Sequence, residues 1–142
     1  MVKNKCERCI FHGSIVILFG LVVGLLTAVG LLDEAHRGWG AAHLAIITTG
    51  IWILAMASVF PLLVLPKRET SALVWSLLAA GYGVIVATPI EIFTGIRAIE
   101  PIGPVTNWIA FIANVIFLAG ATFSILLTLR GVRTVLKGRQ KG

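Results

Sequence analysis

Four stretches of this chain contain no aspartate, glutamate, lysine or arginine, and each is long enough to cross a membrane. They are residues 9–32, 38–66, 70–90 and 101–129. A helix needs about 20 apolar residues to cross roughly 30 Å of hydrocarbon. Lipid offers the backbone no hydrogen-bond partners, so a spanning segment of this length must form a helix. The sequence therefore predicts an all-α fold, an integral membrane four-helix bundle.

The predicted bundle occupies the whole chain as a single domain. We expect it to cover residues 1–142, with helices at about 9–32, 38–66, 71–93 and 106–130. Apolar residues make up 58% of the chain and charged residues 13%, and the mean hydropathy is +0.98. These values exclude an ordinary soluble domain. The first run follows basic residues, as in a secretory signal, but it is too long and lacks a small-residue cleavage site, so we expect it to stay in the protein.

Most basic residues lie in the two terminal segments and in the connection between the second and third predicted helices, which are all on the same side of the membrane in a four-helix bundle. The ends with most of them hold Lys3, Lys5, Arg8, Lys67, Arg68, Arg130, Arg133, Lys137, Arg139 and Lys141. The other two connections hold only Arg37 and Arg97. By the positive-inside rule, the N- and C-termini are predicted to be cytoplasmic. We expect a multi-pass protein of the cell's inner, cytoplasmic membrane, whose basic tail contacts anionic lipid head groups and binds no nucleic acid.

His43, near the start of the second run, is the residue that most needs an explanation. Ionisable residues inside a membrane are costly and commonly functional. Imidazole is a good axial ligand for haem iron, so His43 is the candidate metal ligand. Gly50 shares its helix face and would leave room for a flat cofactor. Arg37 and Arg97, near the outer surface, would pair with the anionic haem propionates.

A purely structural role for His43 is also open. A hydrogen bond from the imidazole to a backbone carbonyl of another helix would explain the same residue. The bis-histidine pattern of a cytochrome b is missing, because His12 lies near the opposite membrane face. The chain has no Ser/His/Asp arrangement, phosphate-binding loop, H-E-x-x-H motif or paired carboxylates.

Cys6 and Cys9 form a C-x-x-C pair that is followed by His12. A closed zinc site needs four ligands, and the sequence has no second pair of cysteines. On the cytoplasmic side both thiols should stay reduced. We therefore expect neither a metal site nor a redox function at this pair.

Small residues at intervals of four predict close helix packing. They are Gly20, Gly24 and Ala28 in the first run and Ala79, Gly83 and Ala87 in the third. Two polar residues lie in the third and fourth predicted helices. Glu91 is expected to extend to water, and Asn114 is expected to hydrogen-bond across helices as a packing contact.

The second run resembles the second helix of bacterial styrene oxide isomerases. The matching residues are Gly38, Trp39, Ala42, His43, Thr49, Gly50, Ala55, Ala57 and Pro61. The likeness extends to His12 and Gly13, to Gly81, to the number of helices and to the chain length. It covers most of the chain in outline, while the specific motif is confined to the second run.

This resemblance implies a fold, a cofactor and a reaction. Members of the family are oligomeric membrane proteins, thought of as trimers, that bind haem b through the histidine matching His43. It implies a ferric haem iron with one open position, acting as a Lewis acid on an epoxide. The epoxide opens toward a carbocation, and a 1,2-hydride shift gives an aldehyde without net redox change. A small apolar substrate would arrive through the lipid.

The chain departs from the family at two positions that the resemblance implies are catalytic. The family's asparagine, six residues after the ligand histidine, corresponds to Thr49. The family's tyrosine corresponds to Thr88, and the chain's one tyrosine, Tyr82, lies nearly two turns earlier. Thr49 and Thr88 are thus the candidate catalytic residues. A threonine reaches less far than a tyrosine toward an opening epoxide, so the resemblance supports the haem better than the reaction.

Three functions are compatible with the sequence. The first is a haem b epoxide isomerase. The second is a non-catalytic membrane subunit, with or without haem, that packs into a larger complex through its small-residue faces. The third is a haem b protein for electron transfer or sensing.

Overall fold

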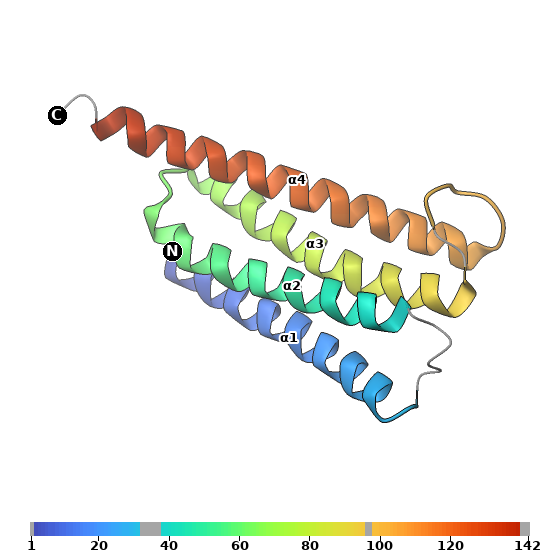
Figure 1. Ribbon diagram of the computed structural model, residues 1–142. Helices are drawn as coiled ribbons and strands as arrows, with labels where there is room; N and C mark the ends of the chain where they lie inside the picture. Colours follow the sequence, from blue (N-terminus) through green and yellow to red (C-terminus); the bar gives the residue numbers. More distant parts are fainter. Residues whose placement is uncertain (1, 32–37, 96–97, 140–142) are drawn as a thin grey trace.

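A computed structural model describes residues 2–31, 38–95 and 98–139 of the protein. Over these residues it has four long helices and no strand (Figure 1). The helices are α1 (Val2–Ala28), α2 (Gly38–Val59), α3 (Lys67–Thr94) and α4 (Val105–Arg139). Each is long and apolar enough to span a membrane. The predicted all-α membrane bundle is confirmed, and the protein is a multi-pass membrane protein.

α1 is shifted toward the N-terminus relative to the expected 9–32. It begins at Val2 because the basic N-terminal segment contains no helix-breaking residue. It ends at Ala28 because Gly30 takes a left-handed conformation with φ of 72°. The Leu31 amide then donates a hydrogen bond to the Leu26 carbonyl at 3.0 Å, which is the pattern of a Schellman cap.

α2 is shorter than the expected 38–66. It stops at Val59 and is followed by a single 3-10 turn, η1 (Phe60–Leu62), after which Leu63 is extended. Pro61 lies in this turn, has no amide hydrogen and would clash with the preceding helical turn. α3 begins at once after Pro66, before the expected residue 71.

α4 is longer than expected, because the basic tail continues the helix to Arg139 instead of ending near residue 130. Its last turns pack on the segment that joins α2 to α3. A Cβ atom on Gly131 would lie 3.2 Å from Leu63 Cβ and Leu65 Cγ. Arg130 also forms an ion pair with Glu69 in the first turn of α3, at 3.0 Å.

The bundle consists of two tightly packed antiparallel pairs. α1 packs mainly on α2, and α3 packs mainly on α4. Glycines make both approaches close. A Cβ on Gly20 would lie 2.7 Å from Ile47 Cγ1 of α2, and a Cβ on Gly83 would lie 2.8 Å from the Ala113 carbonyl oxygen of α4. These contacts confirm the packing role predicted for the spaced small residues.

The core lies where the two pairs meet. Its fully buried side chains include Val16, Ile46, Ile53, Leu73 and Leu77. α1 and α3 run in one direction, α2 and α4 in the other, so both ends of the described chain lie at the same end of the bundle (Figure 1). The first turns of α2 therefore lie at the opposite end from the first turns of α1.

Candidate functional site

His43 lies in the second turn of α2, half-buried against α1. Its Nδ1 atom lies 2.7 Å from the carbonyl oxygen of Gly20. A carbonyl can only accept, so Nδ1 carries the proton and donates it. In the neutral ring, Nε2 then holds a lone pair. The structural role considered for His43, a bond to a backbone carbonyl of another helix, is therefore present in the structure.

The imidazole borders a cavity of about 410 Å³ between α1 and α2. The lining consists of small and aliphatic residues with one threonine: Leu21, Gly24, Leu25, Thr27, Ala28 and Gly40. Gly24 lies directly against the imidazole, and a Cβ atom there would overlap the ring. The ring is thus held between a hydrogen bond and a close glycine contact.

Gly50 was expected to leave room for a flat cofactor on the His43 face of α2. In the structure α1 fills that space. A Cβ atom on Gly50 would lie 2.6 Å from Ile17 Cγ1 and 3.0 Å from the Gly13 carbonyl oxygen. Gly50 therefore permits the close approach of two helices rather than the approach of a ligand.

Thr49 and Thr88, the candidate catalytic residues, both bond to their own helices. The Thr49 hydroxyl donates to the Ala45 carbonyl at 2.7 Å, and the side chain is 8% exposed. The Thr88 hydroxyl donates to the Val84 carbonyl at 2.8 Å. A threonine within a helix can bond in this way to the carbonyl oxygen four residues earlier.

Thr88 borders a second cavity of about 430 Å³, between α2 and α3. Its lining is Gly38, Ala41, Ala42, Ala45, Thr88, Glu91, Ile92 and Gly95. His43 and Gly40 contribute to the first cavity, whereas Ala41, Ala42 and Ala45 contribute to this one. At about 100° per residue these two sets lie on opposite faces of α2. Within one chain, the structure does not bring His43 and Thr88 to one cavity.

The predicted propionate partners, Arg37 and Arg97, lie outside the described residues.

The side chain of Glu91 was expected to extend to water, but in the structure it makes contacts within the protein. Its Oε1 atom accepts a hydrogen bond from the Ala98 amide at 2.9 Å and one from the Asn114 side chain at 2.8 Å. Glu91 thus links α3 to α4, and the cross-helix role predicted for Asn114 is confirmed.

Cys6 and Cys9 are both free thiols, and Cys9 is buried in the core. Within the part of the chain that the structure describes, no three histidine, cysteine, aspartate or glutamate side chains come together as a metal site. The pair packs as apolar residues do, as expected of buried cysteine.

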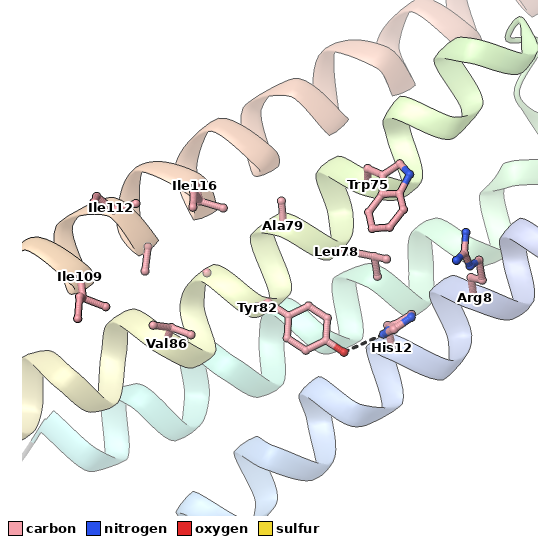
Figure 2. Close-up of a pocket in the computed structure, with 12 residues that line it drawn as sticks. Arg8, His12, Trp75, Leu78, Ala79, Tyr82, Val86, Ile109, Ile112 and Ile116 are labelled. Carbon is pink, nitrogen blue, oxygen red and sulfur yellow. Dashed lines mark hydrogen bonds between the residues drawn. The ribbon is translucent and has the colours of Figure 1, made fainter.

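Sequence reasoning missed a contact between His12 and Tyr82. Nδ1 of His12 in α1 lies 2.7 Å from the Tyr82 hydroxyl in α3 (Figure 2). The pair borders a third cavity, of about 610 Å³. The signal available in the sequence was that polar side chains within apolar helices tend to bond one another. The register of two parallel helices, which decides the partner, is not visible in the sequence.

Comparison with protein families gives one finding that covers most of the chain. A family model described as styrene oxide isomerase matches residues 5–133. Comparison with curated proteins and with solved structures gives no match. The matched range includes His43, both candidate threonines and the His12–Tyr82 pair.

Proposed function

Because this chain belongs to the styrene oxide isomerase family, we propose that it is a membrane haem b protein that isomerises a small apolar epoxide to an aldehyde. One observation supports the proposal above the others: the hydrogen bond from His43 Nδ1 to the Gly20 carbonyl. A histidine that binds a metal commonly donates its other ring hydrogen to a carbonyl or carboxylate. The bond leaves Nε2 as the nitrogen available to iron.

The residues around His43 fit a haem ligand. The ring is fixed in orientation by Gly20 and Gly24, and the cavity beside it is lined mostly by apolar side chains. Such a lining suits a porphyrin and limits the access of water. Arg37 and Arg97 remain the proposed partners of the propionates.

When bound, haem would supply a Lewis acid that polarises the epoxide C–O bond. The protein's own residues would hold the haem and orient its histidine ligand. His43 would hold the iron, and the Gly20 carbonyl would strengthen the imidazole as a ligand by accepting its hydrogen bond. Leu21 and Leu25 would exclude water from the reacting epoxide, so that the carbocation rearranges instead of being hydrated.

We further propose that the protein works as a homo-oligomer, with the trimer expected from the family. The support is that His43 and Thr88 border cavities on opposite faces of α2. If both act on one substrate, the Thr88 cavity must come from a second copy. The Thr88 hydroxyl would then have to leave the Val84 carbonyl to donate to a substrate oxygen.

The test begins with the visible spectrum of protein purified in detergent after expression with ample haem. We expect a Soret band that is lost in His43→Ala. His12→Gln is the matched control, since His12 is bonded to Tyr82 and should not hold the iron. If the wild-type protein carries no haem, or if His43→Ala retains it, the ligand assignment is wrong.

Turnover separates the isomerase from a second candidate, a haem-binding membrane protein without isomerase activity. That candidate is favoured by one observation: both threonine hydroxyls donate to their own helices. The isomerase predicts conversion of styrene oxide to phenylacetaldehyde well above an equal concentration of free haem, lost in His43→Ala. Haem binding without such turnover would support the second candidate.

A further inference from the structure

The third cavity, of about 610 Å³, lies between α1, α3 and α4 and has two unlike ends (Figure 2). Figure 2 shows Arg8, His12 and Trp75 toward one end, with the Tyr82 ring near the middle and its hydroxyl directed toward His12. The rest of the lining is aliphatic or glycine: Leu78, Ala79, Gly83, Val86, Ile109, Ile112, Ala113 and Ile116. This separation of polar and apolar lining matches the two parts of an amphiphile.

The His12–Tyr82 pair always leaves one hydrogen-bond donor to spare. If the Tyr82 hydroxyl donates to Nδ1 of His12, the hydrogen of a neutral ring is on Nε2. If Nδ1 donates to the tyrosine oxygen, the hydroxyl hydrogen is left over. Tyr82 is 39% exposed, so the pair is not sealed from a ligand. Either arrangement favours a ligand with an oxygen acceptor.

Arg8 adds a positive charge at the same end. Its guanidinium lies over the Trp75 ring, 5.6 Å from the ring centroid, which holds it beside the cavity. In the described part of the chain the ion pair is Arg130–Glu69, and no carboxylate pairs with Arg8. The planar guanidinium matches a carboxylate with two parallel hydrogen bonds.

The apolar part of the cavity is an open groove lined by side chains of α3 and α4. Its floor is made of Ala79, Gly83 and Ala113, because Gly83 lets the backbones of α3 and α4 come into contact. From Trp75 to Val86 the whole cavity, including the end with Arg8, follows α3 for about 16 Å, at 1.5 Å per residue. A floor of small residues between larger aliphatic side chains suits one extended hydrocarbon chain.

We propose that this groove binds a long-chain carboxylate, with its head group at Arg8, His12 and Tyr82 and its hydrocarbon chain along α3 and α4. The volume lies within the range of about 300–1,000 Å³ typical of small-molecule sites. The single groove favours one chain over the two chains of a phospholipid. Lys5 and Lys67, which lie together at the same end of the bundle, add positive charge that attracts an anion. The site is separate from His43 and does not depend on haem.

Trp75 provides a direct measurement of binding, since it lines the groove and is 60% exposed. The probe is stearate that carries a nitroxide near its carboxyl group, titrated into the detergent-solubilised protein. We expect saturable quenching of tryptophan emission, with the saturable part missing in Trp75→Phe. Stearate with the nitroxide near its methyl end should quench Trp75 much less, because its label would lie at the other end of the groove.

Variants then test the head-group contacts. Arg8→Gln should weaken binding by at least about tenfold, because a charged hydrogen bond is lost. Arg8 is exposed, so this variant should fold normally. Tyr82→Phe should weaken binding by roughly two- to tenfold. Arg133→Gln, an exposed arginine of α4 outside the cavity, and His43→Ala should both bind as the wild type does.

Competition with unlabelled ligands tests the class of ligand. Palmitate should displace the probe better than octanoate, which is too short to fill the groove, and methyl palmitate should displace it poorly. Quenching that does not saturate, equal competition by the methyl ester, or unchanged affinity in Arg8→Gln would overturn the proposal. So would a co-purifying phospholipid, identified by native mass spectrometry, that palmitate cannot displace.

Discussion

At the scale of single residues, two glycines beside His43 have opposite surroundings. Gly24 lies against the imidazole, so that a Cβ atom there would overlap the ring. Gly40 borders the same cavity, yet a Cβ atom there would meet nothing within 4 Å. Gly24 therefore allows the orientation of His43 to be tested without removing the histidine, whereas a methyl group at Gly40 would enter the cavity proposed for haem.

Gly24→Ala is expected to push the imidazole away from the Gly20 carbonyl and to weaken haem binding. Loss of a hydrogen bond behind a metal ligand commonly lowers metal affinity by roughly 10- to 100-fold. The measurement is a haem titration followed at the Soret band, with Gly138→Ala as the control, since Gly138 lies outside the cavity and a Cβ atom there would meet nothing within 4 Å. Equal affinity in both variants would show that Gly24 does not set the position of the ring.

The position of His43 could be predicted from the sequence, because an imidazole in an apolar run stands out. Its partner could not, since Gly20 is on another helix and the bond depends on how the two helices rotate against each other. The same reason explains Gly50. The helical period predicts which face of α2 carries Gly50. It does not predict that α1 covers this face.

At the scale of elements, the pairing of α3 with α4 depends on contact between their backbones. A Cβ atom on Gly120 of α4 would lie 2.5 Å from the Ser76 carbonyl oxygen and 2.9 Å from the Ala80 amide nitrogen. A side chain can relieve such a contact by changing its rotamer, but backbone atoms of a helix cannot. Any side chain at Gly120 must therefore move the two helices apart.

Gly120→Ala is expected to destabilise the protein by about 1–3 kcal/mol, the usual effect of overpacking. The measurement is the midpoint of unfolding in mixed detergent micelles as the fraction of SDS rises. Gly138→Ala is the matched control on the same helix, because a Cβ atom there would meet nothing within 4 Å. That variant should be neutral or slightly stabilising, since alanine favours helix more than glycine. A midpoint for Gly120→Ala equal to the wild type would contradict the prediction.

The number and order of the described helices could be predicted from the sequence runs that contain no charged residue. The residues at which the helices begin and end could not be predicted in this way. The ends are set by local geometry that hydropathy does not register. Gly30 ends α1 by its left-handed conformation, and Pro61 ends α2 by its missing amide hydrogen. α4 runs on into the basic tail, where Gly131 packs against Leu63 and Leu65.

At the scale of the whole molecule, most of the described basic side chains lie at one end of the bundle. The first turns of α1 and α3 and the last turns of α4 carry Lys3, Lys5, Arg8, Lys67, Arg68, Arg130, Arg133 and Lys137. The positive-inside rule predicts that this end faces the cytoplasm. The opposite end, which holds His43 and Glu91, would then face outward.

Reporter fusions should reveal this orientation. Alkaline phosphatase, which folds only outside the cytoplasm, is expected to be inactive when fused after the last residue of the chain. It should be active when fused after Glu100, in the connection between α3 and α4. Green fluorescent protein at the same two positions should give the reverse result. Active phosphatase at the C-terminus would place the basic end outside.

The two cavities on opposite faces of α2 restrict the symmetry of any assembly that joins them. A twofold dimer brings identical surfaces together, so His43 cavities would meet each other and Thr88 cavities would be left unmatched. Joining unlike cavities requires head-to-tail contacts, which form a ring where the rotation between subunits closes and an open filament where it does not. In a closed ring of the proposed oligomer, every subunit would give one half of a reaction chamber to each neighbour, and the number of chambers would equal the number of subunits.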